Sequence, residues 1–244
     1  MSWRVTGAVA RRVLRQLRRD PRTIALILAV PCVLELLLQQ LFGRHSHVFQ
    51  EVGTPLLGLF PFITMFLVTS ITMLRERTSG TLERLMTMPL HKVDILAGYG
   101  IAFALVAVVQ ATLVSTLAFG LLGLDVAGPR WLVVVLAVAN AVLGSTLGLF
   151  VSAFAETEFQ AVQFMPAVVF PQILLCGLFV PRAEMAAWLR AISYVLPLTY
   201  AYDALARTAA NELDGRFALD VAVICGCIVL AVGLGAATLR RRTD

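Results

Sequence analysis

Residues 131–154 read WLVVVLAVANAVLGSTLGLFVSAF and carry no charged side chain. About 20 residues of apolar helix cross the roughly 30 Å hydrocarbon core of a bilayer. This stretch is therefore long enough and apolar enough to span a membrane. Further apolar runs occur along the chain at 23–42, 56–74, 95–123, 161–180 and 218–239. Together these runs predict six transmembrane segments.

The composition agrees with a membrane protein. Of the 244 residues, 59% are hydrophobic and only 14% are charged, and the mean hydropathy is +0.85. In hydrocarbon every backbone polar group must be satisfied within the protein, and runs of this length favour helices over the ~10-residue strands of a barrel. The predicted fold is all-α: six transmembrane helices, an N-terminal cytoplasmic amphipathic helix, and short outer helices between spans five and six.

The basic residues are unequally distributed between the two sides of the predicted bundle. Most of the 20 Lys and Arg residues precede the first run, separate the second from the third, or follow the sixth. Because short cytoplasmic loops carry excess Lys and Arg, we expect both termini in the cytoplasm. The net charge of +5 then reflects membrane orientation, and no nucleic acid partner is expected. The first run is long and lacks a small-residue cleavage pattern, so we expect a retained helix rather than a signal peptide.

Residues 1–22 have the pattern of an amphipathic helix. Apolar residues recur at four-residue steps, at Val5, Val9, Val13 and Leu17. Arginines occupy the other flank, which suits the cytoplasmic membrane surface, and Asp20-Pro21 ends the helix before the first span. The segment is either a plain surface anchor or a connecting helix that touches a partner subunit.

The polar stretch 75–89, RERTSGTLERLMTMP, follows the second run. Gly80 permits a break, Thr81 can cap a new turn, Glu83 suits the positive end of that turn, and Pro89 stops it. The stretch predicts a short cytoplasmic helix that sits in a groove of a soluble partner, although a charged positive-inside loop is the alternative. The candidate coupling residues are Arg75, Glu76, Arg77, Gly80, Thr81, Glu83 and Arg84.

Three segments carry a family resemblance. The order Arg-Glu-Arg-x-x-Gly-Thr-Leu-Glu-Arg-Leu-x-x-x-Pro at 75–89, followed by LCGLFVP at 175–181 and LPLTYAYDAL at 196–205, resembles the permeases of the ABC-2 family. The likeness is to the drug and glycolipid export branch. It implies a permease dimer, formed with itself or with a paralogue, joined to two copies of an ABC ATP-binding subunit that carries ATP and Mg. The implied cargo is a hydrophobic drug or lipid-like compound.

In the resembled family the first, second and fifth spans line the substrate path. Aromatic, methionine and polar side chains in these spans are therefore candidates for the path: Glu35, Phe62, Met65, Phe66, Phe164 and Gln172. Ordinary helix packing is the alternative for the apolar members. A carboxylic acid inside a span is expensive and is a functional candidate by default, but Glu35 could also reach the interface or hydrogen-bond Gln39.

Residues 181–216 are too long for a slack loop, and we expect short helices near the outer interface. In the resembled family this region caps the exit path, which makes Pro181, Trp188, Pro197 and Tyr200 candidates for an outer gate. Trp188 and Tyr200 can equally be interfacial anchors. No nucleophile, base and orienting group occur together, and the acids Asp203, Glu212 and Asp214 in the same segment have no persuasive catalytic partner.

Several chemistries are not expected from this sequence. It contains no Gly-x-x-x-x-Gly-Lys phosphate loop, so ATP has to be handled by another subunit, and this chain is not expected to be an enzyme or to bind a cofactor. The cysteines lie within apolar runs away from the histidines, so no metal site is expected. We therefore predict a connecting helix at 1–22, a transmembrane domain at 23–239 and a cytoplasmic tail at 240–244.

Two other function classes are alternatives for a chain of this kind. A secondary transporter driven by an ion gradient would use Glu35 as its ion or proton site, but the usual discontinuous polar spans are missing. A lipid-modifying membrane enzyme would need clustered acids, histidines or a metal at one membrane face. The preference for arginine over lysine indicates a genome rich in G and C, and we expect the bacterial inner membrane.

Overall fold

The computed structural model describes residues 3–43, 46–81 and 92–238, and these residues form helices and no strand. The all-α prediction is thus confirmed for the described chain. The longer helices are α1 (Trp3–Arg18), α2 (Pro21–Phe42), α3 (His47–Thr78), α5 (Lys92–Leu117), α6 (Arg130–Val151), α10 (Pro197–Ala210) and α11 (Gly215–Thr238). The shorter elements are η1 (Ala118–Leu122), η2 (Ser152–Phe154), α7 (Glu158–Phe164), η3 (Met165–Val169), α8 (Phe170–Leu175), η4 (Arg182–Glu184) and α9 (Ala187–Ser193).

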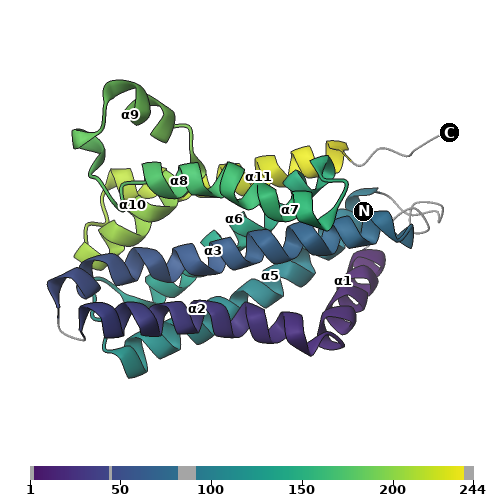
Figure 1. Ribbon diagram of the computed structural model, residues 1–244, viewed down its shortest axis with the longest axis horizontal. Coiled ribbons are helices and arrows are strands. Elements are labelled where there is room, and N and C mark those ends of the chain that lie inside the picture. The colour runs from purple at the N-terminus through teal and green to yellow at the C-terminus, as the bar shows by residue number, and fades with distance from the viewer. Residues whose placement is uncertain (1–2, 44–45, 82–91, 239–244) are drawn as a thin grey trace.

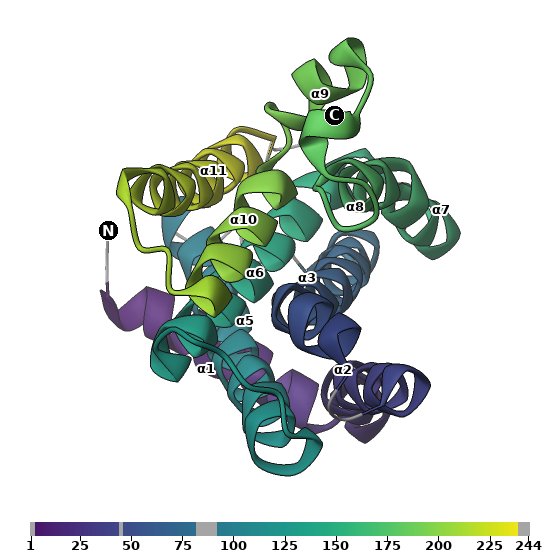
Figure 2. The same cartoon turned by 90° about the vertical axis from the view of Figure 1, so that its left-hand side faces the viewer.

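Within the described chain, five helical segments are long and apolar enough to cross a membrane, where the sequence predicts six. They are Pro21–Phe42, His47–Thr78, Asp94–Leu122, Arg130–Phe154 and Gly215–Thr238. They run along the long axis of the molecule (Figure 1). Viewed along that axis, α6 is surrounded by α3, α5, α10 and α11 (Figure 2), all of which contact it.

The predicted run 161–180 is not one continuous α-helix. It is divided into α7, the π-helical turn η3 and α8. Pro166 and Pro171 lie at the starts of η3 and α8, where each removes a backbone donor and disfavours the regular α-helical ladder. The divided segment still runs beside α3 along the bundle (Figure 1).

Helix α1 lies across one end of the bundle, at a steep angle to the long helices (Figure 1). It buries Thr6, Val9, Ala10 and Val13 and packs mainly on α5. Contact is close at Gly98, where an added Cβ would meet the Cβ of Val9 at 2.6 Å. The chain then turns at Asp20, whose carboxylate accepts hydrogen bonds from the Thr23 amide at 3.2 Å and the Thr23 hydroxyl at 2.7 Å.

The tightest packing joins α3 to α6. A Cβ added at Gly144 would collide with the carbonyl oxygen of Phe62, and one added at Gly148 would collide with the carbonyl oxygen of Phe66. The hydroxyl of Thr69 donates to the Met65 carbonyl at 2.6 Å and also lies 3.1 Å from the carbonyl oxygen of Ser145 on α6. Small residues let membrane helices approach closely, so the small face of α6 serves packing within one chain.

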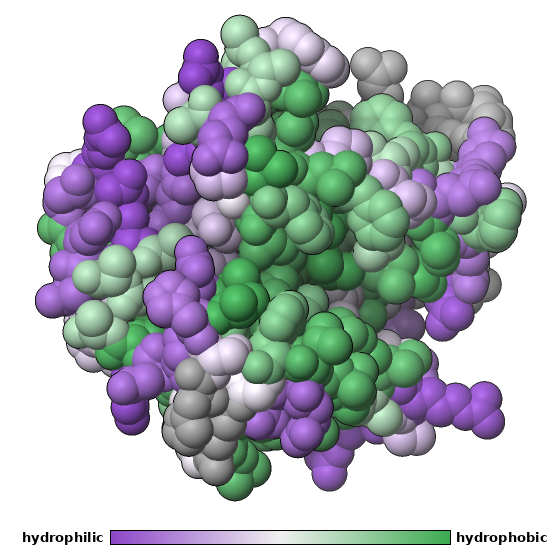
Figure 3. Space-filling view, turned by 60° about the vertical axis from the view of Figure 1, so that its left-hand side comes forward, coloured by the Kyte–Doolittle hydropathy of each residue, from purple (hydrophilic) through white to green (hydrophobic). Residues whose placement is uncertain are grey.

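The outer faces of α2 and α11 are apolar and exposed, as expected of surfaces that meet lipid. Exposed side chains include Leu37 and Leu41 of α2 and Val229 and Leu230 of α11. In Figure 3 apolar side chains gather in the middle of one face, with hydrophilic ones toward its edges.

The contribution of the close α3–α6 packing to stability can be tested by mutation. Because the atom opposite Gly144 belongs to the backbone, Gly144→Ala can be accommodated only if the two helices separate. We expect it to lower the free energy of unfolding by about 1–3 kcal/mol, the usual cost of overpacking. Thermal unfolding of the purified protein in detergent measures the change. Gly226→Ala, where an added Cβ meets nothing within 4 Å, is the control, and equal unfolding of the two variants would refute the packing argument.

Candidate functional site

The last turn of α3 is the point where the polar stretch predicted to couple to a partner enters the described structure. Arg75, Glu76 and Arg77 belong to this turn rather than to a loop, and α3 ends at Thr78. Gly80 follows with φ +69°, a left-handed conformation that glycine adopts without strain, so the chain breaks where the sequence indicates. The hydroxyls of Ser79 and Thr81 lie 2.8 Å apart.

Glu76 joins α3 to α1. Its side chain is 2% exposed, and Arg12 donates to its two carboxylate oxygens at 2.8 and 3.1 Å through one guanidinium nitrogen. Burial disfavours the charged guanidinium, but Glu76 and the nearby Tyr99 outweigh this and raise the pKa of Arg12 above its ordinary value. A carboxylate buried to this degree needs such a partner, since an unpaired charge there would be costly.

The two arginines on either side of Glu76 contact different elements. Arg75 donates to both carboxylate oxygens of Glu158, at the start of α7, at 2.7 and 3.0 Å. This hydrogen bonding lowers the pKa of Glu158. Arg77 donates to the carbonyl oxygen of Ser152, just beyond α6, at 3.0 Å. Consecutive residues of one helical turn therefore reach α7, α1 and the end of α6.

We call this set of contacts the α3 hub, and define it as Arg75, Glu76 and Arg77 with Arg12, Ser152 and Glu158. Sequence reasoning selected the three α3 residues and missed their three partners. No local signal marks these partners, because each lies 64 to 83 residues away in the chain. Glu83 and Arg84, the remaining candidates of the 75–89 stretch, lie outside the described residues.

The proposed path residues of α3 are deep in the bundle. Phe62, Met65 and Phe66 are each 0% exposed and belong to the hydrophobic core. Phe62 and Phe66 follow the line of close contact with α6. In this conformation these three residues pack helices together. Helix packing is the alternative to a role in the substrate path that the sequence left open.

The path candidates of the divided segment lie apart from that core contact. Phe164 is partly buried and borders an open groove of about 440 Å³ that Phe154, Gln160 and Gln163 also line. Gln172 is 4% exposed, and its side-chain amide donates to the carbonyl oxygen of Val168 at 3.0 Å. The structure does not bring Phe62, Phe164 and Gln172 together in one cavity.

Glu35 is fully buried, and neither of its carboxylate oxygens has a hydrogen-bond partner among the described residues. It therefore does not reach the interface, and the hydrogen bond to Gln39 is not formed. A second polar residue, Gln110 of α5, is also buried, and it donates to the Ile27 carbonyl at 2.8 Å and the Thr64 hydroxyl at 2.6 Å. Gln110 is a polar residue within the apolar run 95–123, just as Gln172 is within its own apolar run. The same reasoning could have selected Gln110 from the sequence, and it was missed.

The outer segment contains ion pairs that the sequence did not suggest. Asp203 of α10 pairs with Arg182 of η4, and burial raises the pKa of Asp203. Two guanidinium nitrogens of Arg207 lie 3.5 Å from a carboxylate oxygen of Asp214 and 3.3 Å from one of Asp220, respectively. These ion pairs join α10 to the start of α11. Asp203 and Asp214 therefore form ion pairs with arginines, which is a structural arrangement and not the catalytic one that the sequence argues against.

The four candidate gate residues occupy the same outer region. Pro181 precedes η4, and Pro197 begins α10 at a position that favours proline. The hydroxyl of Tyr200 donates to the carbonyl oxygen of Tyr194 at 2.7 Å, while Trp188 is 66% exposed. An exposed tryptophan on a short helix fits an interfacial anchor better than a buried gate.

Comparison with known proteins adds an independent line of evidence. A family model described as ABC-2 type transporter matches residues 4–209. ABC transporter G family member 20 of Dictyostelium discoideum is 26% identical over 165 residues, which cover 67% of this chain and 23% of the relative. The probable multidrug ABC transporter permease YbhR of Escherichia coli (strain K12) is 29% identical over 148 residues, covering 61% and 40% respectively.

A third relative comes from another bacterium. The linearmycin resistance permease protein LnrN of Bacillus subtilis (strain 168) is 26% identical over 172 residues, covering 70% of this chain and 43% of the relative. The matched regions thus make up less than half of the length of each of these relatives.

The buried ion pair of the α3 hub is testable by a double-mutant cycle. Glu76→Gln leaves Arg12 without its carboxylate, and we expect a loss of about 1–3 kcal/mol in the free energy of unfolding, toward the low end because the Arg12 side chain is 34% exposed. Arg12→Gln combined with Glu76→Gln should cost less than the sum of the single changes. Chemical unfolding in detergent measures each value. Arg11→Gln, an exposed neighbour, is the control, and strict additivity would show that the pair does not interact.

Proposed function

Because this chain belongs to the ABC-2 type transporter family, we propose that it is the membrane-spanning permease of an ABC exporter and is driven by a separate ATP-binding subunit. The permease provides the path through the bilayer, and the partner binds and hydrolyses ATP. The observation that carries this proposal is the α3 hub. It ties the first residues of the predicted coupling segment 75–89 to α1, to the end of α6 and to α7.

The hub suits the transmission of a movement. The contacts made by Arg75, Glu76 and Arg77 reach elements that lie before and after α3 in the chain. A shift of the segment beyond Thr78 would therefore act on α1, the end of α6 and the divided segment together. We propose alternating access, in which closure of the ATP-binding subunits moves this end of α3 and opens the permease outward. These residues transmit the movement and do not catalyse a reaction.

For the topology we propose six membrane passes, with the divided segment α7–η3–α8 as the fifth. Its course beside α3 supports this count (Figure 1). Helix α1 and the end of α11 lie at the same end of the bundle (Figure 1), as an even number of passes requires. The excess of arginine near both termini supports an orientation with that end in the cytoplasm, and we propose the inner membrane of a bacterial cell as the location. The working assembly is two permeases, identical or paralogous, with two ATP-binding subunits.

For the cargo we propose a hydrophobic drug or a lipid-like compound. Two of the relatives are named as a probable multidrug permease and a linearmycin resistance permease. The candidate path residues of this chain are mainly aromatic and sulfur-containing, and such side chains adapt to varied apolar shapes. Glu35 and Gln172 add two buried polar groups with oxygens that lack partners among the described residues.

One observation favours a second candidate, a secondary transporter driven by an ion gradient. Glu35 is a fully buried acid without a hydrogen-bond partner among the described residues, and an intramembrane acid of this kind often belongs to an ion or proton pathway.

Purification of the tagged chain from its native membrane, followed by transport assays in vesicles, separates the two candidates. An exporter subunit should retain an ABC ATPase, and transport should stop when the catalytic residues of that ATPase are changed. Transport that follows an ion gradient without ATP, and that Glu35→Gln abolishes, would favour the secondary transporter.

The pair Arg75–Glu158 provides a test of coupling with little effect on stability. Both side chains are more than half exposed, so their pairing is worth ~1 kcal/mol or less. We expect Arg75→Glu or Glu158→Arg alone to lower transport per ATP hydrolysed by about twofold to fivefold. The combined exchange, Arg75→Glu with Glu158→Arg, should restore it because the pair is re-formed with opposite polarity. Transport and ATP hydrolysis are measured together in proteoliposomes, and a failure of the double exchange to restore coupling would contradict the role of this contact.

A further inference from the structure

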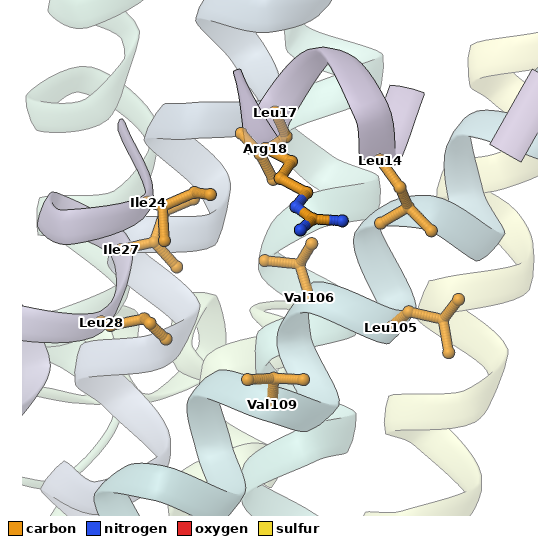
Figure 4. A pocket seen from close by; sticks show the side chains of 9 residues that line it. All are labelled: Leu14, Leu17, Arg18, Ile24, Ile27, Leu28, Leu105, Val106 and Val109. Atoms are coloured by element: carbon orange, nitrogen blue, oxygen red, sulfur yellow. The ribbon is translucent and has the colours of Figure 1, made fainter. Parts of the chain in front are cut away.

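An apolar pocket lies between α1, α2 and α5, at the end of the bundle that α1 crosses (Figure 4). Its volume is about 220 Å³. It is lined by Leu14, Leu17, Arg18, Ile24, Ile27, Leu28, Leu105, Val106 and Val109. Leu105 and Val109 are 50% and 58% exposed, so the pocket opens on the side of the bundle where apolar side chains face outward.

Arg18 is the single charged residue in this lining. Figure 4 shows its guanidinium directed from α1 into the pocket, close to Val106. The structure gives Arg18 no ion pair or side-chain hydrogen bond with the described residues. The nearby acid Asp20 is already engaged by the amide and hydroxyl of Thr23. The Arg18 guanidinium therefore has no anionic partner among the described residues. It can bind an anion such as a phosphate, and the apolar lining can hold an apolar chain attached to that anion.

The surroundings of the pocket also favour an anion. Helix α1 contains arginines and no acidic residue. It lies across the end of the bundle (Figure 1), and apolar residues of α2 and α5 line the pocket next to it. Basic pockets between membrane helices at this depth bind lipid headgroups, because the helices hold the acyl chain while the arginine meets the phosphate.

We propose that this pocket binds an anionic phospholipid, with the phosphate on Arg18 and an acyl chain along Ile27, Leu28 and Val106. The lipid comes from the leaflet next to α1, which is the cytoplasmic leaflet in the orientation proposed above. The lining contains none of the candidate path residues, although it shares α2 with Glu35. Binding the lipid fixes α1, one of the elements joined by the α3 hub, against α2 and α5.

Native mass spectrometry of the purified full chain in detergent tests this site, with phosphatidylglycerol and phosphatidylcholine of the same acyl chains as probes. We expect the wild-type protein to retain phosphatidylglycerol preferentially. Arg18→Gln should weaken that retention about fivefold, which corresponds to one cationic contact. Val109→Trp, which narrows the mouth of the pocket at an exposed position, should weaken the retention of both lipids while Arg18 stays in place.

Arg11→Gln is the matched control, since it removes the same charge from an exposed position of α1 outside the pocket. It should leave retention within about twofold, because charges beyond roughly 8 Å are screened at physiological salt. Equal losses in Arg11→Gln and Arg18→Gln would mean diffuse attraction to the helix and would overturn the site. Equal retention of the two lipids, or displacement of phosphatidylglycerol by free glycerol phosphate at similar concentration, would overturn it as well.

Discussion

The close approach of α3 to α6 is the contact on which the rest of the structure depends. Gly144 and Gly148 bring the backbones so near that the carbonyl groups of Phe62 and Phe66 occupy the space of absent side chains. In lipid, helices gain little from hydrophobic exclusion and associate through such packing and through occasional hydrogen bonds. In the proposed mechanism this packing lets a movement at the end of α3 pass to α1 and α7 instead of being absorbed by slippage of the helix.

Polar groups inside the bundle divide into those that hold helices together and those that remain unsatisfied. Thr69 and Gln110 bond to backbone or side-chain oxygens of other helices. Glu35 has no such partner among the described residues, and an isolated acid in hydrocarbon costs several kcal/mol. A proton, water, a cargo molecule or a second subunit would each lower that cost.

Charged contacts concentrate at the two ends of the bundle, and they differ in how deeply they are buried. At the α3 hub, Arg12 with Glu76 is largely buried whereas Arg75 with Glu158 is exposed. The buried pair fixes α1 to α3, and the exposed pair can break and re-form at little cost. At the outer end, Arg182 with Asp203 and Arg207 with Asp220 hold the short outer elements on α10 and α11. A rigid outer cap and a hub with one weak contact suit a protein that changes conformation from its inner end.

The sequence by itself determined the all-α class, the apolar segments, the break at Gly80 and the family, because each depends on residues that are close together in the chain. Only the tertiary structure decided that the run 161–180 is divided, that Glu35 has no partner among the described residues, and that Arg12, Ser152 and Glu158 meet the end of α3. The contacts at the end of α3 join residues more than 60 positions apart in the chain. The division of 161–180 falls at Pro166 and Pro171, which lie at the starts of η3 and α8. In an apolar helix every face looks suitable for burial, so the pattern that identifies a membrane helix contains little information about which neighbour it will contact.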